Sequence, residues 1–456
     1  MESKTLNKMA VKPILPLLLS MAFPPMISMF IQSLYNIVDS MFVAQVSEDA
    51  LIAVSLAFPI QNLIIALSVG IGVGVNSYVS RKLGEKNQEE ANSAILHGLF
   101  LSSITACIFT ILGLVIIPTF FSLFTDNVSI LKDACTYTNI VVLCCIAPFL
   151  HICIEKVFQA TGNMLIPMMV QTIGAITNIL LDPIMIFGYF GLPAMGVAGA
   201  AIATVIGQFI AMFLSIFILF FRKHDVRVDF SRFQLQVQTI KQILIVAIPN
   251  ACMNALGSIL AIGLNAILIT FSNVAVAIFG VYFKLQTFVF MPASGLTQGA
   301  MPIMGYNYGA KNRQRLIDTL KNSYYIMFII MLCGFFLFMF FPVHLLRLFY
   351  ATEDMLVIGV PALRIMSISF LPATLGFILP TLFQSVGAGG YSLFVFLLRQ
   401  LIITLPLSYL LSKPLGLKGV WISFIFAESI AAIVALILYA KLKKKKAIFR
   451  VEEVEK

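Results

Sequence analysis

Twelve long apolar segments constrain the fold of this chain more than any other feature of its sequence. They run over residues 14–46, 50–80, 92–118, 134–158, 165–188, 194–221, 240–271, 274–305, 320–343, 356–385, 391–412 and 416–440, to within a few residues. A helix needs about 20 apolar residues to cross the hydrocarbon core of a bilayer. In lipid every backbone polar group must be satisfied internally, so such segments fold as helices. The sequence therefore predicts an all-α integral membrane protein with twelve transmembrane helices.

The composition excludes most other classes of protein. Of the 456 residues, 60% are hydrophobic and only 11% are charged, which excludes a disordered chain and leaves little sequence for soluble domains. A net charge of +10 would suggest nucleic acid in a soluble chain, but membrane topology explains it better here, and we expect no nucleic-acid partner. The seven cysteines lie in apolar stretches without a CxxC spacing, so neither a disulfide framework nor a zinc site is predicted.

Basic residues fall mainly on one side of the predicted helices. If the N-terminus lies in the cytoplasm, the loops on the opposite side hold few of the 30 lysines and arginines: only Lys132, Arg347, Lys413 and Lys418. Cytoplasmic loops carry the excess of basic residues in membrane proteins. We therefore expect a multi-pass protein of the inner (plasma) membrane with both termini in the cytoplasm. The KLKKKK run that begins at Lys441 favours contact with anionic lipids.

The two halves of the chain are repeats of one another. Residues 58–87 align without gaps on residues 283–312, at a constant shift of 225 residues. The matched pairs include Phe58/Phe283, Gln61/Gln286, Gly70/Gly295, Gly74/Gly299, Asn87/Asn312 and Pro24/Pro249. Since six is an even number, two six-helix halves have the same orientation in the membrane, as in the parallel repeats of some secondary transporters. The predicted parts are an N-terminal lobe over 1–221, a cytoplasmic linker over 222–239, a C-terminal lobe over 240–440 and a basic cytoplasmic tail over 441–456.

Polar side chains inside the first half's apolar segments mark candidate functional positions, because an ionisable group in hydrocarbon needs a partner, a wet cavity or a function. The first segment carries four polar residues at spacings of three and four, which places them on one helical face: Gln32, Tyr35, Asn36 and Asp39. Asn178 and Asp182 share a face of the fifth segment. Carboxylates are costly packing devices in lipid, so we predict a function for Asp39 and Asp182.

Other segments carry further candidates. Glu155 lies beside Lys156 near the cytoplasmic end of the fourth segment. The second half lacks the acidic pair and offers another set: Lys284, Gln286, Arg364, Arg399 and Glu428. Substrate binding or coupling to an ion is possible for Gln32, Tyr35, Asn36, Glu155, Lys284, Gln286 and Glu428. Lys284 either pairs with an acidic group or repels cationic cargo. Lys156 and Arg399 lie near helix ends, and we expect their charged heads to extend to the membrane surface.

No motif for nucleotide hydrolysis or covalent catalysis is present. The chain has no Walker loop, HExxH or GxSxG, and its glycine-rich stretch over 69–75 lies inside an apolar segment. We therefore predict that the protein is not an enzyme, that it needs no cofactor, and that an ion gradient of H⁺ or Na⁺ drives it. An intramembrane enzyme using Glu155, His151 and Asp182 is disfavoured, because no nucleophile stands in a recognisable arrangement with them.

Several motifs, taken in order, resemble the multidrug and toxic compound extrusion (MATE) family over nearly the whole chain. They are NIVDSMFVAQ closing the first segment, SYVSRKLGEKN after the second, TNILLDPIMIFG on the fifth, GVAGAAIAT on the sixth and GYNYGAKN after the eighth. The stretches IEKVFQATGN and GVWISFIFAES look most like the MepA-type bacterial branch, which is related to the DinF group.

The resemblance implies two lobes in a V around a central cavity, with alternating access and export of drugs or metabolites in exchange for H⁺ or Na⁺. It also implies that Asp39, Asn178 and Asp182 form the cation site of the N-terminal lobe, and that they ligate a metal ion if Na⁺ is the coupling ion. Glu155 matches the branch's acidic residue on the fourth helix. NorM-type members carry an acidic residue on the seventh helix, which is absent here, so the resemblance does not extend to an ion site in the C-terminal lobe.

Two functions fit these observations. The first is multidrug efflux by cation antiport, with amphipathic, commonly cationic small molecules as substrates and a monomer in the lipid bilayer. The second is a flippase for lipid-linked saccharides, which belongs to the same superfamily. A flippase needs a cationic cavity, for which Lys284, Arg364 and Arg399 are the candidates. The acidic residues of the first half favour efflux.

Overall fold

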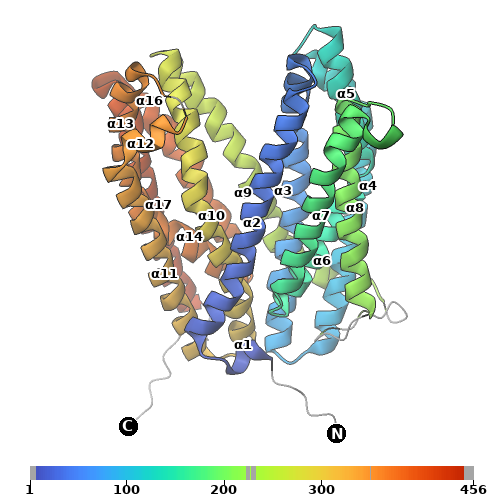
Figure 1. Cartoon of the computed structure of the whole chain (residues 1–456). Coiled ribbons are helices and arrows are strands. Elements are labelled where there is room, and N and C mark those ends of the chain that lie inside the picture. Colours follow the sequence, from blue (N-terminus) through green and yellow to red (C-terminus); the bar gives the residue numbers. More distant parts are fainter. Residues whose placement is uncertain (1–6, 222–225, 227, 229–232, 350, 446–456) are drawn as a thin grey trace. The chain divides into compact units, whose positions relative to one another are not determined.

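The computed structural model describes residues 7–221, 226, 228, 233–349 and 351–445, and every regular element in these ranges is a helix (Figure 1). Within these described ranges, ten helices are long and apolar enough to cross a membrane, and the number rises to 12 if each of two bent helix pairs counts as one span. The prediction of an all-helical membrane protein built from two six-helix repeats is confirmed.

The first half of the chain supplies six spans. A short helix α1 (Lys8–Val11) precedes α2 (Ile14–Ala44), α3 (Glu48–Gly84), α4 (Gln88–Ser122), the bent pair α5 (Val128–Leu143) and α6 (Ile146–Ala160), α7 (Leu165–Phe187), the short turn η1 (Tyr189–Gly191) and α8 (Val197–Phe221). Ser47 caps α3 by accepting a hydrogen bond from the Ala50 N–H at 3.0 Å, and Asn87 caps α4 in the same way. These caps satisfy N–H groups that have no partner inside the helix.

The second half repeats this order. It comprises α9 (Val237–Leu268), α10 (Asn273–Gly309), α11 (Arg313–Phe340), α12 (Pro342–Arg347), the bent pair α13 (Glu353–Ser367) and α14 (Phe370–Ser385), α15 (Gly389–Leu397), the π-helical turn η3 (Leu398–Ile402), α16 (Thr404–Leu415) and α17 (Leu417–Lys445). Ser272 caps α10 and Asn312 caps α11. Each lies 225 residues after its counterpart in the first half, so the repeat of the sequence is also a repeat of local geometry.

The fourth and tenth spans are broken, whereas the sequence predicted continuous segments over 134–158 and 356–385. The bend is 48° between α5 and α6 and 47° between α13 and α14. Each break lies one helical turn before a proline, Pro148 or Pro372. Proline has no N–H to bond the carbonyl four residues earlier, which here belongs to the residue that follows α5 or α13. The helix therefore ends there and a new one begins, with the proline in its first turn.

The described residues divide into two compact units. The N-terminal unit is Pro24–Ala251, and the C-terminal unit combines the described residues up to Phe23 with those from Cys252 onward. The helices α2 and α9 each begin in one unit and end in the other. The predicted lobes, 1–221 and 240–440, instead assign the whole of α2 to the N-terminal lobe and nearly the whole of α9 to the C-terminal lobe. The predicted linker over 222–239 and tail over 441–456 lie partly outside the described residues, and that division of the chain stays a prediction.

Glycines allow the first part of these two helices to pack closely within each unit. In the N-terminal unit, a Cβ atom added to Gly74 would lie 2.5 Å from the Ile243 carbonyl oxygen of α9. In the C-terminal unit, a Cβ atom added to Gly299 would lie 2.8 Å from the Ala22 nitrogen of α2. Gly74 and Gly299 are equivalent in the sequence repeat. Both helices thus dock through backbone contacts that only glycine permits.

Candidate functional site

The two acidic residues predicted to function lie together in the N-terminal unit. Asp39 on α2 is 8% exposed and Asp182 on α7 is fully buried, and their carboxylates interact electrostatically. Asn178, one turn before Asp182, donates from Nδ2 to Asp182 Oδ1 at 3.3 Å and to Thr204 Oγ1 of α8 at 3.2 Å. The structure therefore brings the three predicted cation-site residues into one buried cluster, although their role stays a prediction.

Three oxygen atoms of this carboxylate cluster are buried and accept no hydrogen bond from a described residue. They are Asp39 Oδ1, Asn178 Oδ1 and Asp182 Oδ2. A buried oxygen without a partner is costly, and a buried carboxylate more so. A proton would turn a carboxylate oxygen into a donor, and a hard cation such as Na⁺ takes carboxylate and amide oxygens as ligands. The donor set thus fits either H⁺ or Na⁺.

Two tyrosines stand beside the carboxylate cluster. Tyr35, one turn before Asp39 on α2, is half-buried and interacts electrostatically with both carboxylates. Tyr137 on α5 is 1% exposed, interacts with Asp39, and its hydroxyl accepts a hydrogen bond from Gln61 Nε2 of α3 at 2.8 Å. The prediction included Tyr35 but missed Tyr137, Gln61 and Thr204. A tyrosine in an apolar segment was the available signal, since a buried hydroxyl needs a partner.

The other two residues on the predicted face of α2 lie differently. Gln32 Oε1 accepts a hydrogen bond from Gln171 Nε2 of α7 at 2.8 Å, so it links the two helices that carry the acidic residues. Asn36 is exposed, and its backbone carbonyl accepts a hydrogen bond from the Ser40 hydroxyl at 2.8 Å. The structure therefore places Gln32 on the seam between α2 and α7, and Asn36 on the exposed part of the helix.

Glu155 belongs to a second cluster, on α6. Lys156 Nζ lies 3.1 Å from Glu155 Oε1, and Gln159 Nε2 donates to the same oxygen at 2.8 Å. Lys156 is only 6% exposed. The expectation that its charged head extends to the membrane surface is therefore wrong, because the adjacent carboxylate gives the ammonium group a partner in the interior.

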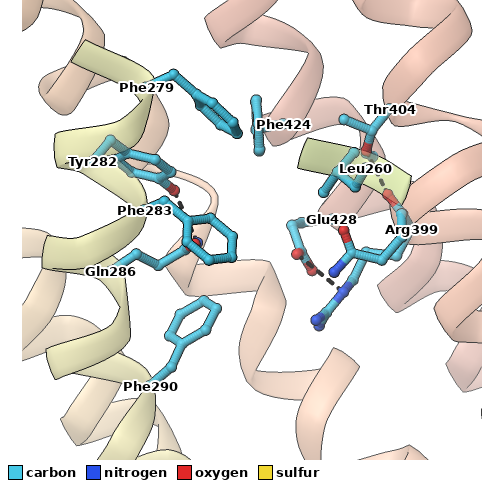
Figure 2. Close-up of a pocket in the computed structure, with 12 residues that line it drawn as sticks. Leu260, Phe279, Tyr282, Phe283, Gln286, Phe290, Arg399, Thr404, Phe424 and Glu428 are labelled. Carbon is cyan, nitrogen blue, oxygen red and sulfur yellow. Dashed lines mark hydrogen bonds and ion pairs between the residues drawn. The ribbon is translucent and has the colours of Figure 1, made fainter. Parts of the chain in front are cut away.

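Three of the second half's candidates, Gln286, Arg399 and Glu428, line a pocket in the C-terminal unit (Figure 2). Gln286 on α10 donates to the Tyr282 hydroxyl at 2.9 Å. Arg399 Nε on η3 lies 3.3 Å from Glu428 Oε1 on α17. Arg399 is 7% exposed, so the expectation that its charged head extends to the membrane surface is also wrong, for the same reason as for Lys156.

Lys284 on α10 lies away from the acidic residues that the structure describes as ion-pair partners. It is exposed, it does not line this pocket, and no ion pair joins it to the part of the chain that the structure describes. The sequence left two alternatives open for Lys284. The first, an ion pair with an acidic group, is not present within the described ranges.

Comparison with known proteins gives one consistent result. The MatE family model matches residues 24–184 and 249–410, two ranges that begin 225 residues apart, like the sequence repeat. The multidrug export protein MepA of Staphylococcus aureus (strain MSSA476) is 27% identical over 469 residues, with 100% of both chains covered. An FAD transporter of Shewanella oneidensis is 27% identical over 415 residues, which cover 89% of this chain and 90% of the relative.

Solved structures agree with the sequence comparisons. A MOP superfamily transporter from Pyrococcus furiosus has a TM-score of 0.90 and 26% identity, covering 99% of this chain and 100% of that one. An outward-facing multidrug resistance MATE family transporter has the same TM-score and identity, covering 97% of this chain and 100% of that one.

Proposed function

Because the chain belongs to the MATE family of multidrug efflux transporters, we propose that it exports amphipathic, commonly cationic compounds in exchange for H⁺ or Na⁺, by alternating access. The protein is a multi-pass protein of the plasma membrane and a transporter rather than an enzyme. We further propose that both termini are cytoplasmic, that the protein works as a monomer surrounded by lipid, and that it has no nucleic-acid partner.

The carboxylate cluster of the N-terminal unit is the observation that carries the proposal. Desolvation and mutual repulsion both penalise the ionised forms of Asp39 and Asp182. A bound cation offsets both penalties. Because the Asn178 amide group donates to Asp182 and Thr204, its oxygen Oδ1 is left to face the ion or to accept a hydrogen bond from a protonated acid. The cluster therefore favours a cation-loaded state.

Competition for this negative charge would couple the ion to the cargo. A cationic substrate in the N-terminal unit gains from the ionised carboxylates, and H⁺ or Na⁺ arriving from outside removes that charge. Ion loading then lowers the affinity for cargo and favours its release, while the neutralised unit returns to the inward-facing state. The ion drives transport only because its affinity differs between the two states.

The flippase is the weaker candidate. It requires a cationic cavity, but Arg399 is paired with Glu428, and Lys284 does not line the pocket. Arg364 on α13 is exposed, and its Nε donates to the Met339 carbonyl at 3.1 Å. The three basic residues therefore do not gather around the pocket of the C-terminal unit.

Export of ethidium from lipid vesicles under separately imposed pH and Na⁺ gradients tests the proposal. Asp182→Asn should insert and fold normally, because it removes a costly buried charge, yet lose gradient-driven export. Asp39→Asn should behave in the same way. Asp126→Asn, at an exposed residue between α4 and α5, is the matched control and should export normally.

Wild-type export by Asp182→Asn under both gradients would refute coupling through the carboxylate cluster. Glu155 or Glu428 would then become the leading candidate. Absence of ethidium export by the wild-type protein, combined with rescue of a defect in the export of cell-wall lipid, would favour the flippase instead.

A further inference from the structure

The pocket of the C-terminal unit has an aromatic wall. Phe279, Phe283 and Phe290 of α10 line it together with Phe424 of α17 (Figure 2), and the ring centroids of Phe279 and Phe424 are 6.4 Å apart. Aromatic rings favour flat apolar bodies through offset or edge-to-face packing. The wall therefore suits a planar aromatic molecule.

Arg399 is held firmly at the polar end of this pocket. Its guanidinium carbon lies 5.1 Å from the ring centroid of Phe377 and 5.3 Å from that of Phe396, which stabilises the charge through cation–π contacts. Its backbone carbonyl accepts a hydrogen bond from the Thr404 hydroxyl, which anchors the π-helical turn η3. The guanidinium is therefore a preorganised positive group that is less than one-tenth exposed.

The pairing between Arg399 and Glu428 is incomplete. The contact between Nε and Oε1 at 3.3 Å lacks the alignment of a hydrogen bond, and Glu428 Oε2 is buried and accepts no hydrogen bond from a described residue. Arginine and carboxylate bind most strongly as a fork with two parallel hydrogen bonds. Arg399 thus keeps donor capacity that a better placed oxyanion would use.

The charges around the pocket favour an anionic ligand over a cationic one. Glu428 and Arg399 are the acid and the base among the twelve lining residues, all of which the structure describes. A cation bound at Glu428 would lie beside the fixed charge of Arg399 and be repelled. An oxyanion bound at Arg399 displaces the unaligned contact with Glu428. The freed Glu428 carboxylate can take up a proton, which removes its repulsion of the bound anion, whereas arginine cannot lose its charge.

We propose that this pocket binds planar aromatic molecules that carry an oxyanion, and that the oxyanion replaces the Glu428 carboxylate on Arg399. The aromatic body lies against the phenylalanine wall. Gln286 and Tyr282 also line the pocket, and their polar groups can form further hydrogen bonds with the ligand. The inference goes beyond the proposed function, because it concerns the C-terminal unit and binding to the pocket is measured without transport.

Tryptophan fluorescence provides a local test. Trp421 is the only tryptophan of the chain. It is buried on α17, two helical turns before Glu428, or about 10 Å along the axis. Anthracene-9-carboxylate accepts energy from tryptophan, so binding of this probe to the full chain in lipid nanodiscs should quench Trp421 saturably. Its uncharged carboxamide and the cationic 9-anthracenylmethylammonium should quench much less.

Two substitutions should move the affinity in opposite directions. Arg399→Gln removes the oxyanion's partner and should weaken binding of the carboxylate probe about tenfold or more. Glu428→Gln removes the competing carboxylate and should tighten binding several-fold. Arg364→Gln, which removes an exposed arginine of the same unit outside the pocket, is the control and should leave the affinity unchanged. General damage to the fold would weaken binding in both pocket variants. Weaker binding by Arg399→Gln together with tighter binding by Glu428→Gln would therefore show that the oxyanion replaces the Glu428 carboxylate on Arg399.

The double variant Arg399→Gln/Glu428→Gln keeps the test valid if Arg399→Gln alone does not fold, because it leaves no unpaired buried charge. It should also lose affinity for the carboxylate probe. Competition by phenyl phosphate would extend the site to phosphate monoesters, and its failure would restrict the site to carboxylates. Tighter binding of the cationic probe, or weaker carboxylate binding in Glu428→Gln, would overturn the proposal.

Discussion

Replacing Glu155 by glutamine tests whether the second cluster of the N-terminal unit stabilises the fold or takes part in coupling. The ion pair joins Lys156 Nζ to Glu155 Oε1 at 3.1 Å, and the two side chains are only 7% and 12% exposed. Removing one partner of a buried pair leaves an uncompensated charge, which typically costs about 3–5 kcal/mol. Lys156 keeps its hydrogen bond to Gln159 Oε1 at 3.0 Å, so we expect a loss near the lower end, about 3 kcal/mol.

A double variant separates the charge from the shape of the side chains. Glu155→Gln/Lys156→Met removes both charges and should recover most of the lost free energy of unfolding, because an ion pair in the interior contributes little net stability over neutral groups of similar size. SDS titration of the protein in mixed micelles measures the free energy of unfolding for each variant. The surface pair between Arg347 and Glu353, at 3.7 Å with 64% and 87% exposure, is the control. Glu353→Gln should cost less than about 1 kcal/mol.

Two outcomes would refute this reasoning. If Glu155→Gln unfolds with the wild-type free energy but loses export under both pH and Na⁺ gradients, Glu155 is a coupling residue and not a structural one. If the double variant is as unstable as Glu155→Gln, the lost stability does not come from removing the carboxylate beside the Lys156 ammonium group.

Two further predictions concern packing and topology. Gly74→Ala and Gly299→Ala should each destabilise the protein by about 1–3 kcal/mol, measured by the same titration. Gly280→Ala is the control, since no described residue of another helix lies within 4 Å of the added carbon, and it should be neutral or slightly stabilising. Equal effects at all three positions would contradict the close approach. In a chain whose native cysteines are replaced, a cysteine at Lys444 should resist impermeant thiol reagents in intact cells and one at Asp126 should react, and reversed labelling would overturn the proposed orientation.

The spans and the acidic residues could be predicted because each leaves a signal in a short stretch of sequence. A run of apolar residues long enough to cross a bilayer has few other uses, and a carboxylate inside it is conspicuous. The spacing of four between Asn178 and Asp182 places them on one helical face whatever the tertiary structure. The broken spans were also visible in principle, since Pro148 and Pro372 interrupt the backbone ladder at equivalent places.

The remaining site residues depend on contacts between helices. Thr204 meets Asn178 across 26 positions of sequence, and Gln61 meets Tyr137 across 76. A single polar side chain in an apolar segment does not indicate which residue of another helix it contacts, because no regular spacing in the sequence relates the two. The surface position predicted for Arg399 was wrong for the same reason, because its partner, Glu428, comes from another helix.

The exchange of α2 and α9 between the units has a consequence for how the protein is made. The C-terminal unit contains the start of α2, which is synthesised first, and the N-terminal unit contains the start of α9, which follows the first six spans. The N-terminal unit therefore cannot be completed until the ribosome has passed residue 251. A cut between α8 and α9 would separate each unit from one of its own helical segments. We therefore expect neither half to fold completely without the other, as in a domain-swapped dimer whose protomers have been joined into one polypeptide.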